Sequence, residues 1–64
     1  MDHFSKDLKK LLLEAGCTFV RDGRGDHEIW YSPISMRKLI VDNKIKSRHT
    51  ANAVLKDAGL PKAF

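Results

Sequence analysis

Two short turn sequences divide the middle of this chain, and they constrain its fold more than any other feature. Asp22-Gly23-Arg24-Gly25 and Ser32-Pro33-Ile34-Ser35 have the composition of turns, and each lies between runs of strand-forming residues. We predict strands over residues 17–21, 26–32 and 36–41. Connections this short favour antiparallel neighbours, because a parallel pair needs a crossover of about a dozen residues. The middle of the chain therefore predicts a three-stranded antiparallel meander.

A helical stripe precedes this meander. Its apolar residues are Phe4, Leu8, Leu11, Leu12 and Ala15. We predict a helix over residues 6–15, with Ser5 as its N-cap and Gly16 as a left-handed C-terminal stop. Cys17 is then expected to pack back on Leu12 as a small hydrophobic residue.

A second stripe follows the meander, with Ala51, Val54, Leu55 and Ala58 at helical spacing. Ser47 or Thr50 is the expected cap at its start, and Gly59 ends it before Pro61. Residues 62–64 are predicted to form a short, irregular tail. The predicted order of elements is α-β-β-β-α.

This order predicts one α+β domain over residues 1–64, with both helices on one face of the antiparallel sheet. Double-stranded RNA-binding domains have the same order of elements. A chain of 64 residues supports only a thin core of two layers, so we expect function on a surface or in a shallow groove. The other face of the sheet, or its rim, is predicted to stay open to a partner.

Composition and charge narrow the function classes. No apolar stretch is long enough for a membrane span, the N-terminus has no signal-peptide core, and Cys17 is the only cysteine, which together predict a cytoplasmic protein. Residues 1–35 carry five basic and six acidic side chains, whereas residues 36–64 carry seven basic and two acidic ones. This clustering suits an anionic partner such as nucleic acid, but it also fits a merely solvated basic face.

The three histidines have different contexts. His3 precedes the first helix and is assigned no role. His49 lies among basic residues at the start of the second helix, where it either helps to bind phosphate or is a solvent-exposed residue near the cap. His27 follows a glycine-rich turn that also carries Arg24, a guanidinium suited to phosphate. Since His27 alternates with Ile29 and Tyr31, it is either a catalytic candidate or a strand residue facing the core.

Other chemistries have little support in the sequence. Asp26, His27 and Glu28 are consecutive, but alternation sends His27 to the opposite face from its neighbours, and no metal-ligand spacing occurs. We therefore predict no metal and no small-molecule cofactor. Trp30, on the face opposite His27, either stacks on an RNA base or belongs to the core or to a protein interface; we favour a structural or interface role.

Several segments together resemble the HicA family of RNA-cleaving toxins. They are Leu12-Leu13-Glu14-Ala15-Gly16, Phe19-Val20-Arg21, Gly25-Asp26-His27-Glu28-Ile29-Trp30 and Val54-Leu55-Lys56-Asp57-Ala58-Gly59-Leu60. The resemblance covers nearly the whole chain, and the order and spacing of the segments carry it. It implies a double-stranded RNA-binding-domain-like fold, cleavage of mRNA, and neutralisation by a HicB-like antitoxin in a bacterial toxin–antitoxin module.

The resemblance also implies that His27 is the catalytic residue, because the family's essential histidine follows a Gly-Ser pair at the start of the second strand. Asp26 stands here where the family usually has serine. We expect RNA-backbone contacts from basic residues near this histidine and in the connection to the second helix, namely Arg24, Lys44, Lys46, Arg48 and His49. The alternatives are a non-catalytic RNA-binding module and a protein-interaction domain.

Overall fold

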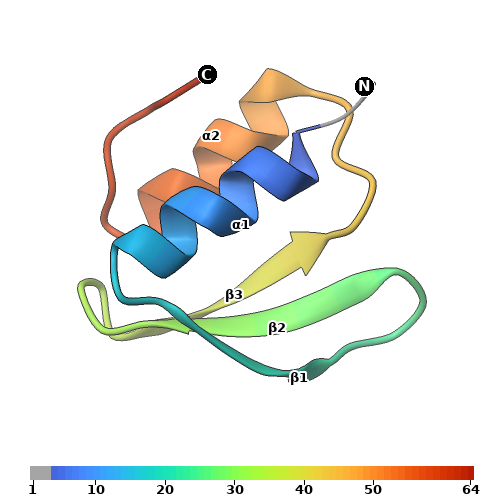
Figure 1. Cartoon of the computed structure of the whole chain (residues 1–64), viewed down its shortest axis with the longest axis horizontal. Coiled ribbons are helices and arrows are strands. Elements are labelled where there is room, and N and C mark those ends of the chain that lie inside the picture. Colours follow the sequence, from blue (N-terminus) through green and yellow to red (C-terminus); the bar gives the residue numbers. More distant parts are fainter. Residues whose placement is uncertain (1–3) are drawn as a thin grey trace.

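A computed structural model describes residues 4–64 and has the element order α-β-β-β-α. The elements are α1 (Ser5–Glu14), β1 (Thr18–Asp22), β2 (His27–Ser32), β3 (Arg37–Asp42) and α2 (Arg48–Asp57) (Figure 1). The strands form one antiparallel sheet in the order β1-β2-β3. The α+β meander predicted from the turns is confirmed. His3 lies outside the described residues.

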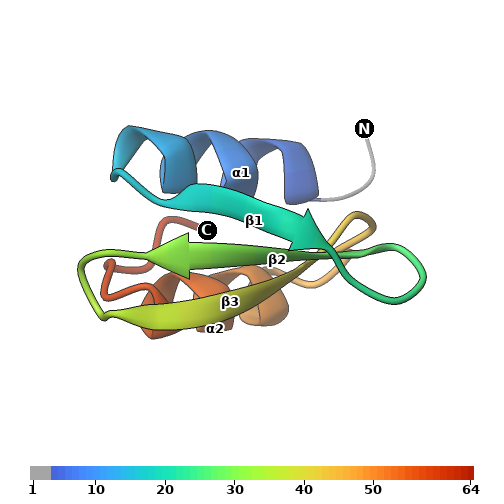
Figure 2. The same ribbon diagram turned by 90° about the horizontal axis from the view of Figure 1, so that it is seen from below.

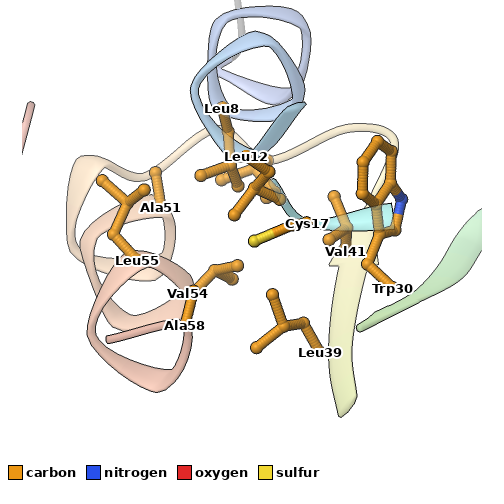
Figure 3. Close-up of a cluster of buried hydrophobic side chains, with 11 residues drawn as sticks. Leu8, Leu12, Cys17, Trp30, Leu39, Val41, Ala51, Val54, Leu55 and Ala58 are labelled. Carbon is orange, nitrogen blue, oxygen red and sulfur yellow. The ribbon is translucent and has the colours of Figure 1, made fainter. Parts of the chain in front are cut away.

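Both helices lie on one face of the sheet, as Figures 1 and 2 show from two directions. Side chains of α1 and α2 meet those of the sheet in a single buried cluster (Figure 3). Its members are Leu8, Leu12, Cys17, Trp30, Leu39, Val41, Ile45, Ala51, Val54, Leu55 and Ala58. Within residues 4–64 the opposite face of the sheet carries no helix, so it is the surface that the fold leaves open.

The strand boundaries differ by one residue from those predicted, and each shift has a local cause. Cys17 belongs to the turn that closes the C-terminal end of α1, because its backbone N–H donates to the carbonyl of Leu12 over 2.9 Å. Strand pairing therefore begins at Thr18. Met36 has a φ of 58°, which keeps it in the turn and starts β3 at Arg37.

The glycine stop predicted after α1 is confirmed, although the helix ends at Glu14, one residue before the predicted Ala15. Gly16 has a φ of +92°, a conformation that glycine adopts without a steric penalty. Cys17, which follows it, is 2% exposed and lies in the core cluster with Leu12. The prediction that Cys17 serves as a small hydrophobic residue is confirmed.

The predicted N-cap of α1 is wrong. Phe4 is the N-cap, without a side-chain hydrogen bond, and Ser5 is the first residue of the helix. The Ser5 hydroxyl instead donates to the carbonyl of Asp42 over 2.7 Å and accepts from the N–H of Ile45 over 2.9 Å. Ser5 is buried, so its hydroxyl satisfies two backbone groups where the chain leaves the sheet. A long-range contact of this kind has no signature in the local sequence.

Helix α2 is flanked by residues predicted from the sequence: Ser47, one of the two candidate caps, and Gly59, the predicted stop. The Ser47 side chain caps its start by accepting from the N–H of His49 over 3.1 Å. At its end, Gly59 has a φ of +81°, and a Cβ added there would lie 2.7 Å from Cγ2 of Ile34. The β2–β3 turn therefore packs closely against the end of α2, and only glycine leaves room for it.

The tail after α2 has no regular secondary structure, as predicted, but it has specific contacts. Phe64 stacks edge-to-face on Phe4, with ring centroids 5.2 Å apart. The Asn52 amide donates to the Phe64 carbonyl over 3.1 Å and accepts from its N–H over 3.2 Å. The tail thus covers the helical layer. Within residues 4–64, neither helix has the length and apolar character that crossing a membrane requires.

Candidate functional site

The open face of the sheet presents the histidine singled out by the sequence. Along β2, Trp30 and Ser32 are buried beneath the helices, which places His27, Ile29 and Tyr31 on the other side. His27 is exposed. The alternation in the sequence allowed His27 to face either the core or the open side of the sheet, and its exposure excludes the core. His27 lies where a large ligand can reach its imidazole.

The sheet register defines the neighbours of these three side chains. Directly opposed residues in an antiparallel pair share a face. Tyr31 lies opposite Thr18 on one side and Lys38 on the other, and Ile29 lies between Arg21 and Ile40. His27 lies opposite Asp42 of β3. The open face of the sheet therefore consists of Thr18, Arg21, His27, Ile29, Tyr31, Lys38, Ile40 and Asp42.

Two cations on this face were missed in the sequence. Arg21 and Lys38 are exposed, and their partners in the register are Ile29 and Tyr31. Residues between Phe19 and Arg21 form a β-bulge, which resets the alternation of β1. Lys38 needed no such correction, since its alternation with the buried Leu39 already places it on the open face.

Trp30 belongs to the core. It is 4% exposed, packs edge-to-face against Phe19 with centroids 6.2 Å apart, and donates from Nε1 to Oε1 of Glu28 over 2.9 Å. Stacking on an RNA base is therefore excluded for Trp30, and the favoured structural role is confirmed. Tyr31, half-buried on the open face, is the aromatic ring available there.

Glu28 joins the sheet to α1. Its Oε2 accepts from Lys9 Nζ over 3.0 Å, while the Lys9 amine also contacts Oδ1 of Asn43. The hydrogen bond from Trp30 is the main cause that lowers the pKa of the Glu28 carboxyl, and the Lys9 ammonium lowers it further against the opposing effect of burial. Glu28 is thus an anion held in the structural layer, away from the open face.

The turn before His27 is fixed by backbone hydrogen bonds. The N–H of His27 donates to the carbonyl of Arg24 over 3.2 Å, and the His27 carbonyl accepts from Gly23 over 2.8 Å. The carbonyl of Asp26 accepts from the N–H of Asn43 over 2.8 Å. His27 is therefore anchored on both sides by β-structure, and Arg24 is held in the same turn.

Lys44, which lies just after the end of β3, also reaches this turn. Its Nζ lies 3.5 Å from Oδ2 of Asp26, and both side chains are largely exposed. The structure thus brings Arg24 and Lys44, two of the five predicted RNA contacts, to the residues beside His27. The carboxylate of Asp26 offsets part of the positive charge of Lys44.

The other three predicted contacts lie further along the chain, after it has left the sheet. Lys46 and Arg48 are exposed. They lie where the chain passes from β3 to α2, and this connection is at the same end of the molecule as the β1–β2 turn (Figures 1 and 2). His49 lines a shallow hollow on the helical layer together with Asn52, Lys56 and Lys62. His27 and His49 therefore lie on opposite layers, and the structure does not pair them.

The described part of the chain holds no cluster of side chains arranged as a metal site. Among residues 4–64 there is no group of three or more His, Cys, Asp or Glu side chains placed to hold a metal ion. Asp26 and Glu28, the neighbours of His27 in sequence, form an ion pair with Lys44 and Lys9 respectively. The acids flanking His27 are thus engaged with lysines.

Comparison with protein-family models matches residues 5–60 to a family described as the HicA toxin of bacterial toxin–antitoxin. The match spans α1 through the residue after the Gly59 stop, so it includes every element of the fold. Comparisons with curated proteins and with solved structures gave no significant match.

Proposed function

This chain belongs to the HicA toxin family and is the toxin of a toxin–antitoxin module, and we propose that it acts as a metal-independent endoribonuclease with His27 as its catalytic residue. The observation that carries the proposal is the position of His27: exposed on the open face, at the rigid start of β2, and beside Arg24 and Lys44. The family supplies the activity class, and the geometry supplies an accessible acid–base group beside cations.

RNA carries its own nucleophile, so the protein needs few groups. The 2′-hydroxyl loses its proton as its oxygen bonds to phosphorus, the bond from phosphorus to the 5′-oxygen breaks, and that oxygen is protonated. The products are a 2′,3′-cyclic phosphate and a 5′-hydroxyl. His27 serves either as the base for the first proton or as the acid for the second, a contribution of about 10²–10⁴-fold.

Cations around His27 have a defined task in this reaction. The pentacoordinate phosphorane carries more negative charge than the ground state, and positive side chains placed beforehand stabilise that charge. Arg24 and Lys44 are the closest of the predicted contacts to the turn. The remaining predicted contacts are Lys46, Arg48 and His49, which lie in the β3–α2 connection and the first turn of α2. They bind the RNA backbone further from the reacting phosphate.

The open face supports binding of single-stranded RNA. Tyr31 offers a ring on which a base can stack, and Arg21 and Lys38 flank it and its neighbour Ile29 with positive charge. Ile40 is 65% exposed on the same face. This mixture of apolar and basic side chains also suits a covering protein, and we propose that a HicB-like antitoxin neutralises the toxin by masking His27.

The test is RNA cleavage by the pure protein in EDTA, compared with the His27→Ala variant. Wild-type protein is expected to shorten mRNA. His27→Ala is expected to lose this activity while its circular-dichroism spectrum is unchanged, because the His27 side chain is exposed. Cleavage retained by His27→Ala would overturn the assignment. RNA binding without cleavage by the wild type would instead favour the non-catalytic RNA-binding module.

A further inference from the structure

The open face places an acidic side chain directly across from His27. In the register of β2 and β3, His27 is paired with Asp42, the last residue of β3. The next pair out, Asp26 and Asn43, is joined by the 2.8 Å hydrogen bond from the Asn43 N–H, so hydrogen-bonded and non-hydrogen-bonded pairs alternate from there. His27 and Asp42 therefore form a non-hydrogen-bonded pair, the kind in which opposed side chains lie closest.

Asp42 is held more firmly than an ordinary strand end. Its carbonyl accepts from the buried Ser5 hydroxyl over 2.7 Å, which ties this residue to the start of α1. Its carboxylate Oδ1 accepts from the backbone N–H of Lys44 over 2.8 Å, which sets the orientation of the side chain. These two bonds leave Oδ2 as the oxygen available to another donor.

The ion pairs of the described residues involve carboxylates other than that of Asp42. Among residues 4–64 the ion pairs join Lys9 to Glu28 and Lys44 to Asp26, and neither uses the Asp42 carboxylate. Asp42 is half-buried, whereas the His27 imidazole opposite it is exposed and able to rotate. In the conformation seen here the two groups form no hydrogen bond. With Cβ atoms about 4.5–5.5 Å apart, as in pairs of this kind, rotation of the ring brings one nitrogen to the carboxylate.

We propose that Asp42 is a positioning residue for His27: its carboxylate accepts a hydrogen bond from one imidazole N–H and so fixes which nitrogen faces the RNA. This inference rests on the proposed function. A neutral imidazole has one protonated and one unprotonated nitrogen, and only the correct tautomer can accept the 2′-hydroxyl proton. A carboxylate behind the ring selects that tautomer and stabilises the imidazolium that forms.

The test is Asp42→Asn, with Asp22→Asn as the matched control. Asparagine keeps an Oδ1 that can accept from the Lys44 N–H, so the turn should survive the substitution. Asp22 is exposed at the same end of the sheet, but it lies opposite Glu28 and therefore on the other face. The two variants remove the same charge, and only one removes it from beside His27.

We expect Asp42→Asn to lower kcat for RNA cleavage about tenfold with KM little changed, and Asp22→Asn to leave both constants near the wild-type values. Unchanged kcat in Asp42→Asn, or an equal loss in both variants, would overturn the proposal. Nitrogen-15 spectra of the His27 ring supply a second readout that needs no cleavage. We expect one dominant tautomer in the wild type and a mixture in Asp42→Asn; the same tautomer population in both proteins would also overturn it.

The two readouts separate this inference from the proposed function. If wild-type protein does not cleave RNA, or if His27→Ala does, the ribonuclease assignment fails, while the ring spectra still report on the pairing with Asp42. If His27→Ala is inactive and Asp42→Asn is fully active, the ribonuclease assignment stands and the positioning role is wrong.

Discussion

Trp30 donates its indole N–H to Glu28 over 2.9 Å, across two residues of the same strand and on the face covered by the helices. This bond and the Lys9 ammonium lower the pKa of the Glu28 carboxyl. A carboxyl with a lowered pKa in the folded state stabilises the fold above its unfolded pKa, and this stabilisation is lost as the pH falls through the folded value.

We therefore predict that the wild type becomes less stable as the pH falls from about 5 into the acid range, where an unperturbed glutamate titrates near 4.3. Glu28→Gln should lower the unfolding free energy at pH 7 and should show a shallower loss on acidification. Urea unfolding of both proteins at neutral and acid pH measures this. Parallel pH profiles for the two proteins would contradict the role given to Glu28.

Ser5→Ala should destabilise the fold. The substitution removes a buried hydroxyl that serves two backbone groups, the carbonyl of Asp42 and the N–H of Ile45. Leaving buried polar groups without partners costs about 1–3 kcal/mol. Thermal or urea unfolding measures the loss.

Ser35→Ala is the matched control for Ser5→Ala. The Ser35 hydroxyl is buried but has no hydrogen-bond partner among residues 4–64. Its removal should change the unfolding free energy little, or raise it slightly, because no partner is stranded. A loss as large as that of Ser5→Ala would show that burial alone, and not the bridge from α1 to Asp42, sets the cost.

Gly59→Ala should destabilise the fold for two reasons. Its φ of +81° disfavours any Cβ, and the new Cβ would meet Cγ2 of Ile34 at 2.7 Å. Gly25→Ala is the control, because Gly25 also has a positive φ, +61°, but has open space around it. It should show only the conformational cost, about 1–2 kcal/mol, and Gly59→Ala should cost more.

Replacing Ile34 with alanine distinguishes the steric collision at Gly59 from the conformational cost of its positive φ. Ile34 is half exposed, so its truncation alone should cost little. In the Gly59→Ala background the same truncation should recover part of the lost stability, since it removes the atom that the new Cβ meets. Additive effects in the double variant, measured by urea unfolding, would mean that the collision is not the cause.

Asp26→Ser should strengthen RNA binding. The Asp26 carboxylate lies 3.5 Å from Lys44 Nζ, so its removal leaves the full charge of that lysine for phosphate. Lys44→Ala should weaken binding and reduce the slope of log affinity against log salt by about 0.7 for single-stranded RNA. Fluorescence titrations at several salt concentrations measure both, best in a His27→Ala background that leaves the RNA intact. An Asp26→Ser protein that binds more weakly would contradict the proposed offset.

Much of the fold was predictable because its signals are local. The glycine at position 16, the turn around Pro33 and the apolar spacing in both helices each act within a few residues, and together they gave the element order. The antiparallel pairing of neighbouring strands then followed from the short connections, which leave an antiparallel neighbour as the nearest partner. The family resemblance pointed to His27 in the same way, through a short segment of sequence.

The site was only partly predictable because its geometry is long-range. Alternation along β2 separates His27 from Trp30, but it does not tell which set faces the helices. That choice depends on where α1 and α2 pack. The same packing separates His49 from His27, although both lay in plausible basic contexts.

The sequence by itself determined the elements, their order, the open sheet face and a histidine beside a glycine turn. Only the tertiary structure decided that this histidine faces outward, that Ser5 bridges to Asp42 rather than capping its own helix, and that Asp42 stands opposite His27. The physical reason is the distance along the chain. Caps and turns are decided by neighbouring residues, whereas burial and cross-strand pairing are decided by residues that meet only after the chain has folded.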